Sequence, residues 1–159
     1  MRNIRNPYLK MGNNPSHCFG CSPFNENGLH LQFQDTGDEV ITNWTPSAMF
    51  EGYTGIVHGG ILATLLDEVS MWFIYTKCNT AGVTSEMAIQ YLRPVRIGNG
   101  NIVASARLSE KNKNLITLAC SIVDELGNTC CTGKFTFFVF PEEIARTKFH
   151  YPGVESFYE

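Results

Sequence analysis

The fold is decided by the stretch HGGILATLLDEVSMWFIY, which covers residues 58–75. Residues 61–75 are apolar at almost every position and contain neither proline nor glycine, so they predict a helix that other parts of the chain enclose. The pair Gly59-Gly60 comes directly before them. The first turn of a helix has free backbone N–H groups and partial positive charge. The start of this helix is therefore a candidate anion-binding cradle.

Asp67 lies in the middle of this predicted helix. A carboxylate is costly to bury unless it has hydrogen-bonding partners or a chemical task. An oxyanion donor at the helix start and an acid inside the helix are together typical of acyl chemistry. A purely structural carboxylate is the alternative that the residues alone leave open. Glu68 points about 100° away around the helix, and we expect it to be a helix-surface or interface acid.

Composition predicts one globular domain. The chain has 159 residues, 43% hydrophobic content and a formal net charge of −3. This length suffices for a sizeable core, and the charge gives no electrostatic reason to expect nucleic-acid binding. The apolar run at 61–76 is interrupted by acids and is too short to span a bilayer, so we expect no membrane association. The first residues do not resemble a signal peptide, which predicts a cytoplasmic protein.

Six cysteines raise the question of a metal site. Cys18 and Cys21 have the C-x-x-C spacing, and with His17 and His30 a four-ligand zinc site can be drawn. No second C-x-x-C follows, so turn-forming or buried thiols are the preferred interpretation, and we expect neither a metal nor a cofactor. The others are expected to be reduced, small core residues: Cys78, Cys120, Cys130 and Cys131.

Outside the predicted helix, the sequence predicts strands joined by turns. Residues 1–27 are polar and turn-rich and predict an N-terminal arm, with a short helix near Tyr8–Met11. Apolar residues alternate over 29–33 and 40–44, which predicts a hairpin. After the helix, alternation and turn residues predict four more strands, near 87–91, 101–109, 115–124 and 129–140. Residues 142–159 are expected to be a frayed C-terminal tail with a short helical start.

This order of elements predicts the fold class. Strands joined by short turns, with one segregated helix, favour an antiparallel α+β domain over an alternating parallel one. The run lengths fit an antiparallel β-sheet wrapped around one long central helix, with the domain at residues 28–141.

A family resemblance agrees with this prediction. The motif Phe50-Glu51-Gly52-x-x-Gly55-x-Val57-His58-Gly59-Gly60-x-x-Ala63-Thr64-Leu65-x-Asp67, followed by Tyr91-x-Arg93-Pro94, resembles the hotdog-fold acyl-CoA thioesterases. The nearest group is the PaaI-type proteins of the thioesterase superfamily. The resemblance covers about residues 28–140, and the lead-in from Cys18 to Leu31 also recurs in some relatives.

The resemblance implies roles for single residues. Asp67 matches the acid that serves as general base or nucleophile, and Gly59 matches the residue whose backbone N–H polarises the thioester carbonyl. His58 matches a helix-entry histidine with a supporting role, and a capping role is its preferred interpretation here. Thr84 matches a hydroxyl residue that helps to hold the attacking water or the acid. An ordinary strand residue is the alternative for Thr84.

One position departs from the family pattern. Several relatives have Asn or Gln six residues before the histidine, where this chain has Gly52. Glu51 is the candidate for the water-orienting part. We expect Gly60, Glu51 and Arg93 to contact the substrate.

The spacing of Gly59 and Asp67 predicts the oligomeric state. Eight residues of helix separate them by roughly 12 Å, too far for both to act on one carbonyl group. Two antiparallel copies of the helix around a two-fold axis would bring together a Gly59 and an Asp67 from different protomers. We therefore expect a homodimer, or a dimer of dimers, in agreement with the family.

The residues that could bind the substrate allow two interpretations. Bulky side chains near the helix can line an acyl tunnel or simply pack in the core: Tyr53, Met71, Trp72, Phe73 and Met87. Cations can hold a nucleotide phosphate or lie on solvated strand faces: Arg93, Arg96, Arg107 and Lys134. Hydrolysis of acyl-CoA or other acyl thioesters is the preferred function. A non-catalytic acyl-CoA-binding module and an enoyl-thioester hydratase or dehydratase are the alternatives.

Overall fold

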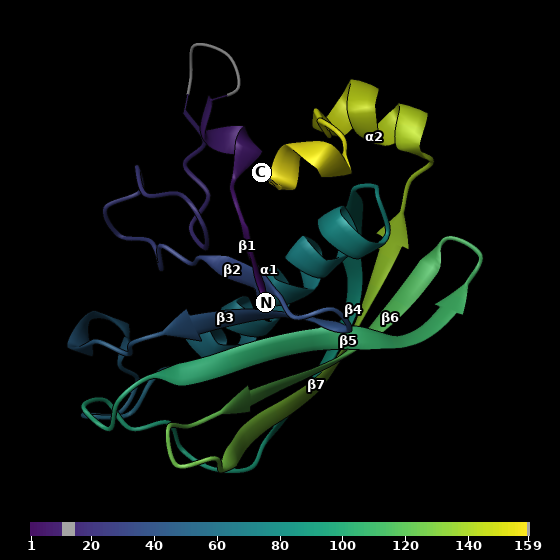
Figure 1. Cartoon of the computed structure of the whole chain (residues 1–159). Helices are drawn as coiled ribbons and strands as arrows, with labels where there is room; N and C mark the ends of the chain where they lie inside the picture. The colour runs from purple at the N-terminus through teal and green to yellow at the C-terminus, as the bar shows by residue number, and fades with distance from the viewer. Residues whose placement is uncertain (11–14, 159) are drawn as a thin grey trace.

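The computed structural model describes residues 1–10 and 15–158. Its described strands form one antiparallel sheet that curves around a long helix (Figure 1). The elements, in chain order, are β1 (Arg2–Ile4), η1 (Pro7–Lys10), β2 (Phe33–Asp35), β3 (Glu39–Trp44), η2 (Ala48–Phe50), α1 (Gly59–Lys77), β4 (Gly82–Tyr91), β5 (Ile102–Asn112), β6 (Leu115–Val123), β7 (Thr129–Val139), α2 (Glu142–Phe149) and η3 (Val154–Phe157). The strand order is β1-β2-β3-β5-β6-β7-β4. This is the predicted hotdog fold.

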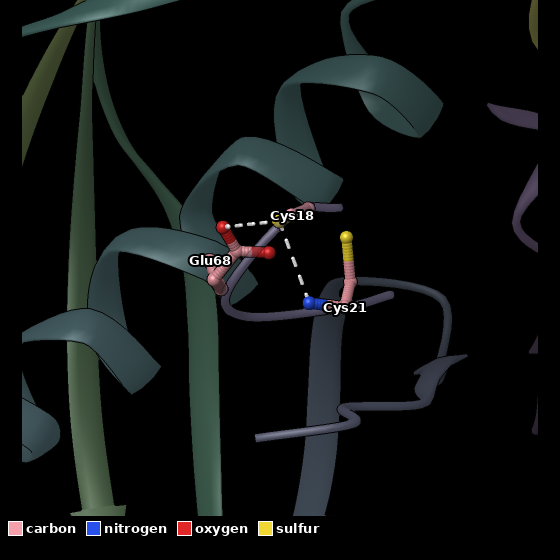
Figure 2. Close-up of side chains that lie close together, drawn as sticks. All are labelled: Cys18, Cys21 and Glu68. Carbon is pink, nitrogen blue, oxygen red and sulfur yellow. Dashed lines mark hydrogen bonds between the residues drawn. The ribbon is translucent and has the colours of Figure 1, made fainter. Parts of the chain in front are cut away.

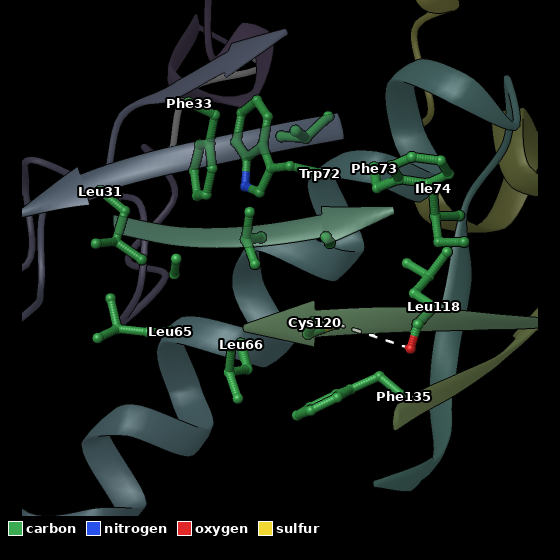
Figure 3. Packing of buried hydrophobic residues seen from close by; sticks show 14 of the residues in the cluster. Leu31, Phe33, Leu65, Leu66, Trp72, Phe73, Ile74, Leu118, Cys120 and Phe135 are labelled. Carbon is green, nitrogen blue, oxygen red and sulfur yellow. Dashed lines mark hydrogen bonds between the residues drawn. The ribbon is translucent and has the colours of Figure 1, made fainter. Parts of the chain in front are cut away.

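Helix α1 has the length and burial that its sequence predicts. It runs for 19 residues, from Gly59 to Lys77, and Leu65, Leu66 and Val69 are fully buried. Its buried side chains pack against the sheet, with Leu66 near Phe135 of β7 (Figure 3). No helix in the described part of the chain is long and apolar enough to cross a membrane.

The segment before β2 differs from the prediction. The predicted strand at 29–33 is shorter, because only Phe33–Asp35 forms a strand. Leu29 and Leu31 are buried as expected, but their N–H groups bond to the carbonyls of Phe19 and Gly20 rather than to a neighbouring strand. The turn at Cys18–Cys21 therefore takes the place of a strand here.

The two ends of the chain also join the fold. Residues 2–4 of the expected arm form β1, which pairs antiparallel with β2 at the sheet edge. The predicted short helix is the 3-10 turn η1, and Met11 lies outside the described residues. The predicted helical start of the tail is α2. The described part of the tail is not frayed, because Phe157 is fully buried and stacks on Tyr75 of α1, with ring centroids 5.5 Å apart.

Trp72 provides a direct test of the packing between α1 and the sheet. It is 2% exposed and stacks on Phe33 of β2, with ring centroids 4.5 Å apart (Figure 3). We expect Trp72→Ala to lower the free energy of unfolding by about 3–5 kcal/mol, because the indole is lost and a cavity is left. Denaturant unfolding measures this difference. Leu126→Ala is the control, since Leu126 is 85% exposed and should change the stability by less than about 0.5 kcal/mol.

Candidate functional site

The start of α1 has one backbone donor that no part of the described chain uses. His58 is the N-cap residue, and its Nδ1 accepts a hydrogen bond of 2.9 Å from the N–H of Gly60. The carbonyl of His58 accepts from the N–H groups of Ile61 and Leu62. Among the described residues, only the N–H of Gly59 in this first turn is left without an acceptor. The predicted cradle therefore offers an anion one backbone N–H fewer than expected, because His58 already accepts from the N–H of Gly60. The capping role of His58 is confirmed.

Gly59 lies on the wall of a cavity of about 610 Å³. The cavity lies between the start of α1, the loop at 52–57 and the segment that follows β4, and Tyr53 and Arg93 also line it. The hydroxyl of Tyr91, at the end of β4, donates a 2.8 Å hydrogen bond to the carbonyl of Gly59. A Cβ at position 59 would lie 3.4 Å from the Tyr91 ring. The hydrogen bond from Tyr91 to Gly59 is a contact that the sequence pattern did not predict.

A hydrogen bond within the loop before α1 stabilises that loop. The carboxylate of Glu51 accepts a 2.9 Å hydrogen bond from the N–H of Gly55, and Glu51 is not among the residues that line the cavity. A Cβ at Gly52 would lie 3.3 Å from Cα of His58. The glycine at the position where relatives carry Asn or Gln therefore lets the loop lie close against the helix cap. Glu51 fastens this loop, and its water-orienting role stays a prediction.

Asp67 and Thr84 are in contact near the middle of α1. The hydroxyl of Thr84, on β4, donates a 2.7 Å hydrogen bond to Oδ1 of Asp67. Burial raises the pKa of the Asp67 carboxyl group, while the hydrogen bond from Thr84 acts in the opposite direction. Asp67 does not line the cavity beside Gly59. The structure thus brings together Asp67 with Thr84, and Gly59 with Tyr91, at two separate places in one chain.

A bulge in β4 decides which face Thr84 occupies. Thr84 pairs with Phe137 of β7, Glu86 pairs with Thr136, and Ser85 is the extra residue between them. Residues directly opposite on antiparallel strands share a face, so Thr84 lies on the inner face with the buried Phe137. Met87 lies on the same face, opposite Phe135. Without the bulge, residues 84 and 87 would point to opposite faces, and Thr84 would not reach Asp67.

Strand β4 is an open edge of the sheet. It pairs with β7 on one side, and it is the last strand in the order on that side. Val83, Met87 and Tyr91 are 45%, 48% and 53% exposed. A ten-residue edge with exposed apolar side chains is a site where another chain can add a strand.

Glu68 does not lie where we expected it. It is partly buried beneath the turn at Cys18–Cys21, and the thiol of Cys18 donates a 3.6 Å hydrogen bond to its Oε1 (Figure 2). Burial, followed by the nearby Cys18, raises the pKa of Glu68 to about 8. Of the two alternatives, a helix-surface or an interface acid, the first does not hold within the chain, because the N-terminal segment covers this side of α1. Sequence periodicity cannot show which segment covers a helix face.

In the described structure, Cys18 and Cys21 lie beside Glu68 rather than beside the two histidines. Cys18 and Cys21 lie in a turn, and His30 bonds through Nε2 to the carbonyl of Asn25. His17 and His30 are not grouped with the two thiols in the described structure. The remaining cysteines are free, as expected, and three of them are buried: Cys120, Cys130 and Cys131.

The aromatic residues and cations that were candidates for substrate binding lie in different parts of the structure. Trp72 and Phe73 are core residues, 2% and 5% exposed, whereas Tyr53 is exposed at the cavity. Arg93 lines this cavity, and Arg96 lines a smaller one beside it, of about 240 Å³. The other two candidate cations, Arg107 and Lys134, lie elsewhere, on the β5–β7 strands of the sheet.

Comparisons with known proteins find similarity to thioesterases. Residues 54–131 match the family model described as Thioesterase superfamily. Acyl-coenzyme A thioesterase 13 of Mus musculus is 40% identical over 81 residues, which are 50% of this chain and 54% of that protein. The chain thus spans about half the length of the curated relatives it matches.

Solved structures show the same fold. A Streptococcus mutans protein bound to acetyl CoA superposes with a TM-score of 0.65 and 20% identity, over 70% of this chain and 90% of that one. A hypothetical thioesterase protein of Streptococcus pneumoniae with coenzyme A gives the same TM-score of 0.65 at 21% identity, and covers the same shares, 70% and 90%. Residues 54–131 are thus similar to the thioesterase superfamily, and the chain shares its fold with these solved structures.

Proposed function

We propose that this protein hydrolyses acyl-CoA thioesters to a free acid and CoA. The observation that carries the proposal is the N–H of Gly59, which has no acceptor in the described chain and lies at the wall of a cavity at the start of a 19-residue helix. A donor of this kind stabilises the negative charge that develops on a thioester carbonyl oxygen under attack. The positive end of the helix dipole adds to the effect.

Asp67 is the proposed base. Its carboxylate takes a proton from water while the water oxygen attacks the carbonyl carbon. The tetrahedral intermediate then expels the thiolate, and the C–S bond breaks. A thiolate is a good leaving group, so this apparatus needs no strong acid. Direct attack by the carboxylate is the alternative route, and Thr84 orients Asp67 in both.

The proposed site is shared between two protomers. Gly59 and Asp67 lie roughly 12 Å apart along α1, so they cannot act on one carbonyl group within a single chain. If β4 pairs antiparallel with its copy around a two-fold axis near residues 87–88, Thr84 of one protomer lies opposite Tyr91 of the other. Thr84 contacts Asp67, and Tyr91 contacts Gly59. This pairing therefore brings the acid of one protomer to the donor of the other, twice per dimer.

The dimer is tested at the centre of β4. In Met87→Lys, one lysine from each protomer would lie close to the two-fold axis, at diagonally neighbouring positions of the paired strands, and like charges this close destabilise strand pairing. We expect this variant to elute as a monomer in size-exclusion chromatography with light scattering, and to lose hydrolysis. Leu126→Lys, on an exposed turn, should stay dimeric and active. A fully active Met87→Lys monomer would contradict a shared site.

The substrate-binding part of the proposal concerns Arg93, Gly60 and Glu51. Arg93 supplies a cation at the cavity for a CoA phosphate, while Gly60 and Glu51 shape the helix start and its loop. The hydratase alternative is disfavoured because Nδ1 of His58 accepts from Gly60, which places the proton of the neutral ring on Nε2, so neither ring nitrogen is available as a base.

The function is tested by the release of free thiol from a panel of acyl-CoAs with aromatic, medium-chain and long-chain acyl groups. We expect turnover on at least one of them. Binding of the panel with zero turnover would favour the non-catalytic module. Hydration of an enoyl-CoA without thiol release would favour the hydratase.

A further inference from the structure

The turn at Cys18–Cys21 lies directly on α1, at the residue next to Asp67 (Figure 2). The Sγ atoms of Cys18 and Cys21 and a carboxylate oxygen of Glu68 all lie within 4.8 Å of one another. In the described part of the chain, this is the group of three or more His, Cys, Asp or Glu side chains that is close enough to share one ion. The mechanism proposed above uses none of the three.

The backbone holds this arrangement in place. The N–H of Cys21 donates to Sγ of Cys18 at 3.4 Å, and the N–H of Ser22 donates to the Cys18 carbonyl at 3.2 Å. Gly20 lies against Glu68, since a Cβ there would be 2.3 Å from the carboxyl carbon. On the other side, Leu31 bonds to the carbonyl of Gly20 at 2.8 Å. The turn is therefore positioned on the carboxyl group before any ligand binds.

Among the residues that the structure describes, none forms an ion pair with this cluster. Each of its three groups becomes an anion when it loses its proton. The ion pairs among the described residues join Lys77 to Asp35 and Arg146 to Glu142, and neither involves Glu68. Partly buried anions without a partner are costly, and a divalent cation removes that cost when it replaces their protons.

We propose that Cys18, Cys21 and Glu68 bind a divalent metal ion of the zinc class. Thiolates select such ions, with metal–sulfur distances of about 2.3 Å and metal–oxygen distances of about 2.0–2.2 Å. In a tetrahedral site these lengths place sulfur and oxygen roughly 3.6 Å apart, and Cys18 Sγ lies 3.6 Å from Glu68 Oε1. The fourth position takes water. The thiols and the carboxyl group release their protons as the ion binds, and the ion fastens the N-terminal segment to α1 beside Asp67.

The test is a titration of the reduced full-length chain with Co²⁺, which replaces Zn²⁺ and reports thiolate ligands through a charge-transfer band in the ultraviolet. We expect one ion per chain and loss of the band when Zn²⁺ is added. Cys18→Ser should abolish the band, and Cys78→Ser, which changes a distant cysteine, should keep it. Glu68→Gln keeps both thiolates and the side-chain shape, and should weaken Co²⁺ binding by roughly 10- to 100-fold.

A second measurement avoids dependence on variants that fold poorly. The melting temperature of the wild-type chain should rise with Zn²⁺ concentration and fall when a chelator is added, because an ion that binds the folded state stabilises it by mass action. The proposal is overturned if the reduced wild-type chain gives no band. It is also overturned if the band survives in a Cys18→Ser/Cys21→Ser variant. Formation of a Cys18–Cys21 disulfide by a chain that binds no Co²⁺ would assign the pair to redox chemistry instead.

Discussion

Asp67→Asn should lower kcat for acyl-CoA hydrolysis by about 10²–10⁴-fold and leave KM nearly unchanged, since a positioned general base contributes this much to the transition state and little to substrate binding. The substitution is suited to the site because asparagine keeps the shape of the side chain. Its amide oxygen can still accept the hydrogen bond that Thr84 donates to Asp67. The fold and the cavity should therefore stay intact while the proton acceptor is lost.

The control for this variant is Asp38→Asn, which removes an exposed carboxylate from the turn between β2 and β3. Both variants should melt at temperatures close to that of the wild-type chain, so that a loss of activity cannot be assigned to unfolding. Steady-state thiol release measures kcat and KM separately. If Asp67→Asn retained more than about a tenth of the wild-type kcat, Asp67 would be a structural carboxylate and the base would have to be sought elsewhere.

Gly59→Val should reduce turnover by about 10²–10³-fold, the range found when one oxyanion donor is removed. The N–H group remains in this variant, but the branched side chain blocks its approach to the substrate. The larger valine side chain has little room on the Tyr91 side, because even a Cβ at position 59 would lie 3.4 Å from the Tyr91 ring. Gly59→Ala is the graded control. Its Cβ makes an ordinary contact, so it should fold normally and lose less activity than Gly59→Val.

The parts of this structure that depend on local patterns were predictable from the sequence. Helix α1 and the strands β5 to β7 lie close to where hydrophobic periodicity and turn residues predict them. Strand β4 is longer than the predicted 87–91, since it begins at Gly82, and as an edge strand without a fully buried residue it gives only a weak periodic signal. β1, with three residues, is too short to give a periodic signal. Its place at the sheet edge depends on pairing with β2, about thirty residues away in the chain.

The candidate site also has parts that the sequence predicted and parts that depend on long-range packing. The resemblance implies that Thr84 holds the attacking water or the acid, and its hydroxyl donates a 2.7 Å hydrogen bond to Asp67. The bulge at Ser85, which turns Thr84 toward Asp67, is a matter of register with β7 and leaves no mark in the alternation of β4. Glu68 was placed on a helix surface because its own helix gives no information about the turn that covers it.

The most direct measurement of the central claim mixes two inactive variants. Asp67→Ala and Gly59→Val are unfolded together and refolded as a mixture, so that about half of the dimers contain one chain of each kind. In such a dimer the intact Asp67 of one chain faces the intact Gly59 of the other, and one of the two sites is complete. We predict recovery of about a quarter of the wild-type activity from two parents that have almost none. If the mixture stays as inactive as its parents although mixed dimers have formed, acid and donor do not come from different protomers, and the shared site is wrong.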